Sequence, residues 1–70
     1  MKLTNRRREI ITYMAHGKTT RQIASEMGLA DGTIRRYRQI MYEQMGLTGV
    51  DHPGVRLVTW FVKLLKGDER

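Results

Sequence analysis

Apolar residues recur along the chain at the three- and four-residue spacing of helices. The first such group predicts a helix that Thr4 caps and that runs to about residue 15. Gly17 is expected to end it, because glycine readily adopts the left-handed conformation that follows many helix C-termini. The apolar positions of this helix are Ile10, Ile11 and Met14.

A second, shorter helix is predicted to begin at Thr19. Gln22 stands three residues later, which is the spacing of a capping box, where each side chain bonds the backbone N–H of the other residue. Gly28 is expected to stop the helix, and Leu29 in the turn is expected to fill the core. The narrow apolar face of this helix consists of Ile23, Ala24 and Met27.

The third helix is predicted to open at Asp31 or Thr33, to run to about Met45 and to end at Gly46. Its core-facing stripe consists of Ile34, Tyr37, Met41 and Met45. Another face carries Arg35, Arg38, Gln39 and Tyr42, with Arg36 beside them. Such a helix can pack against a core and still present arginine and glutamine to DNA bases. The alternative is an exposed helix with ordinary surface arginines.

A loop over residues 48–54 precedes a fourth helix, for which Asp51 is the predicted cap and Pro53 lies in the first turn. One apolar stripe of this helix consists of Val55, Val58, Val62 and Leu65. A second stripe consists of Leu57, Trp60, Phe61 and Leu64. One small core cannot absorb both stripes, so the surplus predicts a partner surface, most simply a second copy of the chain. The alternative is a helix that the preceding loop covers.

These elements predict an all-α, four-helix fold with one domain over residues 1–70. The short second helix, the glycine-containing turn and the arginine-rich third helix form a helix-turn-helix, whose second helix enters the DNA major groove. A chain of 70 residues buries only about 60% of its unfolded surface, so a deep substrate pocket is not expected.

The net charge is +6, which favours a polyanionic partner. Residues 1–38 hold nine Lys or Arg against three Asp or Glu, whereas residues 39–70 hold four of each. The excess charge therefore belongs to the helix-turn-helix, although a merely soluble basic surface is the alternative. Three consecutive arginines, Arg6, Arg7 and Arg8, crowd the first turn of the first helix, where the helix dipole disfavours cations. Either a phosphate or carboxylate lies nearby, or the arginines form a solvated cluster that pairs with Glu9.

Several classes of protein are not expected. The chain has no cysteine, so disulfides and thiolate metal sites are absent. It has no apolar run of about 20 residues and no signal peptide, which predicts a cytoplasmic protein without membrane contact. His16 and His52 are the only histidines, and no ligand set accompanies them. We therefore expect no enzyme activity, no cofactor and no metal.

Four short motifs occur in order. The first comprises Leu3, Thr4, Arg6, Arg8, Glu9, Ile10 and Ile11. The second comprises Gly17, Thr19, Arg21, Gln22, Ile23 and Ala24; the third Gly32, Thr33, Ile34 and Arg35; the fourth Met45, Gly46 and Leu47. With these motifs the chain resembles the DNA-binding region of the LuxR/NarL/GerE class of bacterial transcription regulators over about residues 3–65.

The resemblance implies roles for individual residues. The third helix would enter the major groove, with base contacts from Arg35, Arg36 and Gln39. Contacts to the DNA backbone would come from Thr19, Thr20, Arg21, Thr33, Tyr37 and Arg38. The fourth helix would mediate dimerisation, which assigns the interface to Leu57, Trp60, Phe61 and Leu64.

The chain departs from the class at four places. Arg7 replaces an acidic residue, and Ala30 replaces the serine that caps the recognition helix, so Asp31 or Thr33 would serve instead. Ile40 replaces a frequent asparagine, and the loop before the fourth helix is longer. Because the sequence starts just before the first motif, the resemblance is to the small stand-alone, GerE-like members without an input domain.

The leading hypothesis is a dimeric regulator of transcription that binds an inverted repeat in double-stranded DNA. The alternative is a small interaction module whose apolar fourth helix binds and inhibits a host regulator or a component of RNA polymerase. A promoter-reading domain like that of a sigma factor is a third possibility, disfavoured because the polymerase-binding segments are missing.

Overall fold

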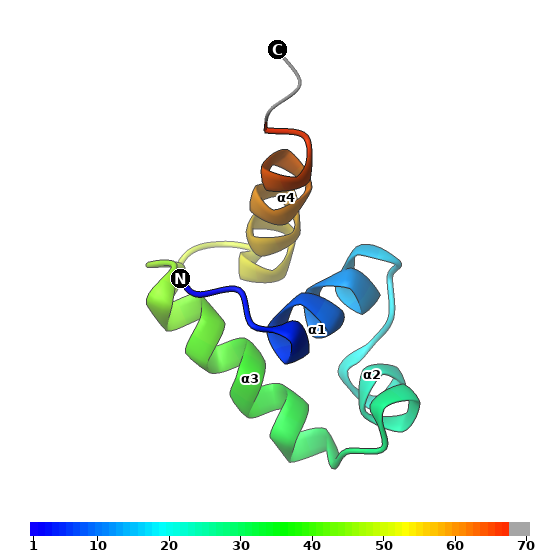
Figure 1. Ribbon diagram of the computed structural model, residues 1–70. Coiled ribbons are helices and arrows are strands. Elements are labelled where there is room, and N and C mark those ends of the chain that lie inside the picture. The colour runs from blue at the N-terminus through cyan, green and yellow to red at the C-terminus, as the bar shows by residue number, and fades with distance from the viewer. Residues whose placement is uncertain (68–70) are drawn as a thin grey trace.

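The computed structural model describes residues 1–67 and places four α-helices within them (Figure 1). The helices are α1 (Asn5–Ala15), α2 (Thr20–Met27), α3 (Asp31–Gln44) and α4 (Pro53–Leu65). The described part of the chain contains no strand. The predicted all-α, four-helix class is therefore confirmed, and the last three residues of the predicted domain lie outside the described range.

Most helix ends lie where the caps predicted them. Thr4 accepts a hydrogen bond from the backbone N–H of Arg7 at the start of α1. Thr19 and Gln22 form both hydrogen bonds of a capping box, at 3.1 and 2.8 Å. Gly28 follows α2 with φ of +67°, the left-handed conformation that glycine adopts without steric cost. These local signals confirm the predicted boundaries of α1 and α2.

Two predicted caps are wrong. Ala30 is the N-cap of α3 and provides no side-chain hydrogen bond, because the helix already begins at Asp31. The Asp31 carboxylate lies in the first turn, where the helix dipole favours it. At α4, His52 rather than Asp51 is the N-cap; it has φ of +52° and gives no side-chain bond. Pro53 lies in the first turn as predicted.

One small apolar core joins all four helices. Its members are Ile10, Ile11, Ile23, Ala24, Ile34, Met41, Leu57 and Phe61, each at most 4% exposed. α2 packs mainly against α3, while α4 packs against α1 and also touches α3. Figure 1 shows the consequence for α4: its first turns lie against the other helices, and its C-terminal end projects away from them.

Candidate nucleic-acid interface

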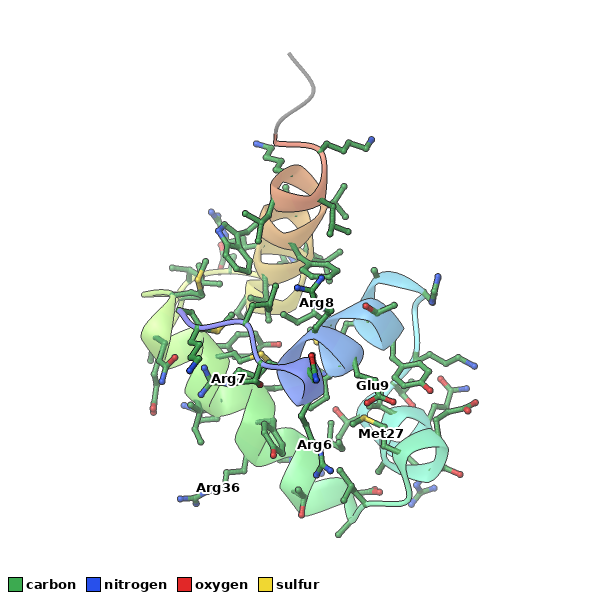
Figure 2. The ribbon with its side chains drawn as sticks, in the orientation of Figure 1. Arg6, Arg7, Arg8, Glu9, Met27 and Arg36 are labelled. Carbon is green, nitrogen blue, oxygen red and sulfur yellow. The ribbon has the colours of Figure 1, made fainter. Side chains whose placement is uncertain are left out.

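Arg35, Arg36 and Gln39 are all exposed and lie on the outer side of α3. Together with Gly32 they line one shallow hollow. We call these three side chains the reading face. The opposite side of the same helix carries Ile34 and Met41, both fully buried. The core thus holds α3 in place and leaves the reading face free, and Figure 2 shows Arg36 pointing away from the other helices.

The reading face has the chemistry that base recognition needs. An arginine fork matches the two acceptors on the major-groove edge of guanine, and a glutamine amide matches the donor and acceptor of adenine. The Gln39 amide donates only a long hydrogen bond, 3.4 Å, to the carboxylate of Glu43. That contact is weak enough for the amide to exchange it for a base.

The start of α2 lies beside α3. Thr19 is exposed, and the Arg21 side chain is 89% exposed, with its guanidinium Nε 3.8 Å from the Asp31 carboxylate. An ion pair this exposed is worth little, so Arg21 can turn to another anion. Thr20 is half-buried, and its hydroxyl accepts a hydrogen bond of 2.7 Å from Nη1 of Arg38.

Thr33 and Tyr37 lie next to the reading face. Both are half-buried, and they line a second shallow hollow of α3 together with Arg36 and Ile40. Tyr37 packs against the core. This placement agrees with the predicted position of Tyr37 on the core-facing stripe of α3.

α4 differs from the prediction. Leu57 and Phe61, assigned to a dimer interface, are 0% and 4% exposed and belong to the core. The assignment of these two residues is wrong, because a partner could reach them only if the core opened. Trp60 is half-buried against the core. The exposed apolar residues, which we call the α4 patch, are Val55, Val62, Leu64 and Leu65.

The charged side chains on the same helix as the α4 patch are all positive. The helix from Pro53 to Leu65 carries Arg56 and Lys63 and has no acidic residue.

Within residues 1–67, no helix has the length and apolar character that crossing a bilayer requires.

Comparison with known proteins adds independent evidence. The family described as "Bacterial regulatory proteins, luxR family" matches residues 1–52, about three quarters of the chain. The chain belongs to this luxR family. Its members are DNA-binding regulators of transcription rather than enzymes.

Three relatives are similar to this luxR-family chain. "Spore germination protein GerE" of Bacillus subtilis (strain 168) is 32% identical over 56 residues, covering 80% of this chain and 76% of GerE. "Transcriptional regulatory protein DesR" of the same organism is 37% identical over 43 residues, covering 61% of this chain and 22% of DesR. "Probable HTH-type transcriptional regulator GfsR" of Streptomyces halstedii is 38% identical over 60 residues, covering 74% of this chain and 25% of GfsR. The chain thus spans about a quarter of DesR and GfsR. No solved structure matches it.

The luxR-family chain also contains a contact that the sequence did not indicate. Arg38 and Tyr42 were placed on the outer face of α3, but both are half-buried. Nε and Nη2 of Arg38 donate to the Tyr42 hydroxyl at 3.1 and 3.0 Å. Helical spacing puts these residues at the border of the polar face, and only the neighbouring helices decide which way they turn.

The three arginines at the start of α1 do not form one cluster. Figure 2 shows Arg6, Arg7 and Arg8 pointing in different directions. Nη1 of Arg7 donates to the Lys2 carbonyl and to the Gln44 side chain, both at 3.0 Å. The two ion pairs found in residues 1–67 involve neither these arginines nor Glu9, so the alternative in which the arginines pair with Glu9 is not observed.

Proposed function

We propose that this luxR-family chain binds double-stranded DNA sequence-specifically as a homodimer and reads an inverted repeat. The reading face enters the major groove, where Arg35, Arg36 and Gln39 contact base edges. The observation that carries the proposal is the division of α3 into a fully buried apolar side and an exposed Arg/Gln side. The luxR-family match and the relatives DesR and GfsR, which are named as transcriptional regulators, support the regulatory part of the proposal by similarity.

Phosphate contacts position the chain on the duplex. Their proposed sources are Thr19, Thr20 and Arg21 at the start of α2, and Thr33 and Tyr37 on α3. Exposed Arg21 supplies a charge that needs no rearrangement of the core. Such contacts fix register and orientation, whereas the reading face supplies the choice of sequence.

The α4 patch is the proposed dimer contact. Val55, Val62, Leu64 and Leu65 replace Leu57 and Phe61 in this role, because only exposed side chains can meet a second copy. Half-buried Trp60 lies on the same helix. A second candidate function rests on the same patch: it could instead bind a host regulator or a component of RNA polymerase.

Selection of bound duplexes from a random library at near-physiological salt tests the proposal. Enrichment of an inverted repeat with half-site centres about one helical turn apart would support both specific binding and the dimer. Enrichment of a single half-site would support DNA reading and contradict the dimer. Weak, salt-sensitive binding without enrichment would contradict specific reading and favour the protein-interaction function.

A pair of variants tests the dimer separately. Leu65→Lys places a charge in the α4 patch and is expected to leave a monomer at concentrations where the unmodified chain is dimeric. Affinity for a full repeat should then fall to that for a half-site, with half-site binding unchanged. Thr48→Lys adds the same charge at an exposed loop position and is the control. Sedimentation velocity and fluorescence anisotropy provide the two readouts.

A further inference from the structure

Three helices meet at the half-buried side chain of Arg38. Its guanidinium bonds Thr20 in the first turn of α2 and Tyr42 on α3, over distances of 2.7 to 3.1 Å. Gly54, in the first turn of α4, lies near the same group, since a β-carbon at this position would come within 3.3 Å of it. We infer that Arg38 is a positioning residue for DNA binding: it fixes the first turn of α2 relative to α3 and links both to the start of α4. The inference rests on the proposed docking of α2 and α3 on DNA.

The shape of the guanidinium explains the link. Nε and Nη2 form one edge of the planar group, and both donate to the Tyr42 hydroxyl. Nη1, on the other side, donates to the Thr20 hydroxyl. Three of the five N–H donors are therefore occupied, in directions set by a rigid fork. A lysine carries the same charge but cannot make this arrangement.

Gly54 joins α4 to this group. A β-carbon at Gly54 would lie 3.2 Å from the Tyr42 hydroxyl oxygen and 3.3 Å from Nη2 of Arg38. The first turn of α4 thus passes near the Arg38–Tyr42 pair, and a side chain at Gly54 would fit only if the pair moved by a few tenths of an ångström. The absence of a side chain at Gly54 leaves room for the Arg38–Tyr42 pair, which in turn bonds Thr20.

The consequence concerns the phosphate contacts. Thr20 lies between Thr19 and Arg21, and these three residues are the proposed contacts of α2 with the DNA backbone. The orientation of their turn relative to the reading face decides whether phosphate and base contacts form together. Tyr42 should therefore influence DNA binding although its hydroxyl is directed at Arg38.

Tyr42→Phe tests the inference, because it removes one hydroxyl and keeps every charge. Tyr13→Phe is the matched control: this tyrosine is also half-buried, and its side chain makes no hydrogen bond in the described structure. In the free chain, Tyr42→Phe is expected to shift the backbone amide resonances of Thr20 and Arg21, and Tyr13→Phe is not. Affinity for the selected duplex should fall about three- to tenfold, as expected for one hydrogen-bonded site, with an unchanged salt slope.

Arg38→Lys completes a double-mutant cycle. If Arg38 and Tyr42 act as one unit, the double variant binds DNA no more than about twofold worse than Arg38→Lys alone. If the affinity losses of Arg38→Lys and Tyr42→Phe multiplied in the double variant, the inference would be overturned. So would a Tyr42→Phe chain with unshifted α2 amides and unchanged affinity. If Arg38→Gln lowered the salt slope by about 0.9 while Tyr42→Phe had no effect, Arg38 would be a direct phosphate contact instead.

The two readouts separate this inference from the proposed function. An unmodified chain that selects no duplex would overturn the proposed function and the DNA-binding role of Arg38 with it. The amide shifts of the free chain would still support or overturn the link from Tyr42 to Thr20. Circular dichroism of each variant ensures that only folded chains are compared.

Discussion

α3 and α4 both carry many apolar residues, yet the sequence predicted their exposed faces with different success. On α3, the buried residues Ile34 and Met41 lie opposite the exposed reading face, as expected. On α4, one of the two apolar stripes contains core residues Leu57 and Phe61, although it was assigned to the partner. Periodicity identifies a buried face when polar residues occupy the other side, and it cannot rank two apolar faces.

The largest effect is expected from a substitution in the core. It tests the difference between the buried and the exposed apolar face of α4. Leu57→Ala is expected to lower the free energy of unfolding by about 2–5 kcal/mol, because it leaves a cavity in a fully buried site. Leu65→Ala, at a position 60% exposed, should change the stability of the monomer little. Urea unfolding at low protein concentration measures both. If Leu57→Ala and Leu65→Ala lowered the free energy of unfolding equally, the assignment of Leu57 to the core and Leu65 to the surface would be wrong.

Base reading by α3 should produce the next largest effect. Arg35→Ala and Gln39→Ala are each expected to weaken binding to the selected duplex by about 1–3 kcal/mol and to relax the preference at one base pair. Arg8→Ala removes an equal charge from α1 and should leave the preference unchanged. Anisotropy titrations with single-base variants of the duplex provide the measurement. If Arg35→Ala and Gln39→Ala retained the original preference, the reading face would be wrongly assigned.

Arg21 at the start of α2 should behave differently from the reading face. Arg21→Ala is expected to weaken binding to all duplexes alike and to reduce the slope of log K against log salt by about 0.9, as loss of one phosphate contact requires. A salt titration on selected and scrambled duplexes checks this. A sequence-dependent loss would instead place Arg21 at a base.

Helix caps should produce the smallest effects, of opposite sign for α2 and α3. Thr19→Ala removes the capping box and should cost about 1 kcal/mol of stability. Ala30→Ser supplies the side-chain acceptor that α3 lacks and should add about as much. Ala15→Ser, at the exposed end of α1, is the control for the same substitution away from an N-cap. Thermal unfolding resolves these changes, and an unstabilised Ala30→Ser chain would contradict the assigned start of α3.

The correct and incorrect predictions divide by the range of the interactions behind them. Thr4, Thr19 and Gly28 act within a few residues of the chain, and their roles follow from local spacing. The start of α3 does not follow from local spacing alone, because Asp31 and Thr33 both offer cap chemistry. A shift of one residue turns Asp31 from a cap into a member of the first turn.

The candidate site shows the same division. Arg35, Arg36 and Gln39 point outward regardless of how neighbouring helices pack, because the apolar stripe of α3 fixes their direction. Arg38 lies at the edge of that stripe, where α2 and α4 approach. Its contacts join residues 18 positions apart in the chain, so no local pattern could indicate them.

Because the charges on α4 are all positive, ionic strength should affect dimerisation and DNA binding in opposite directions. In the proposed dimer, association through the α4 patch would bring Arg56 and Lys63 of each copy toward the same charges of the other, and dissolved ions would screen that repulsion. The same ions compete with the arginines for DNA phosphates. If the chain pairs as proposed, added salt favours the pairing while it disfavours binding to DNA, so occupancy of an inverted repeat should be greatest at an intermediate salt concentration.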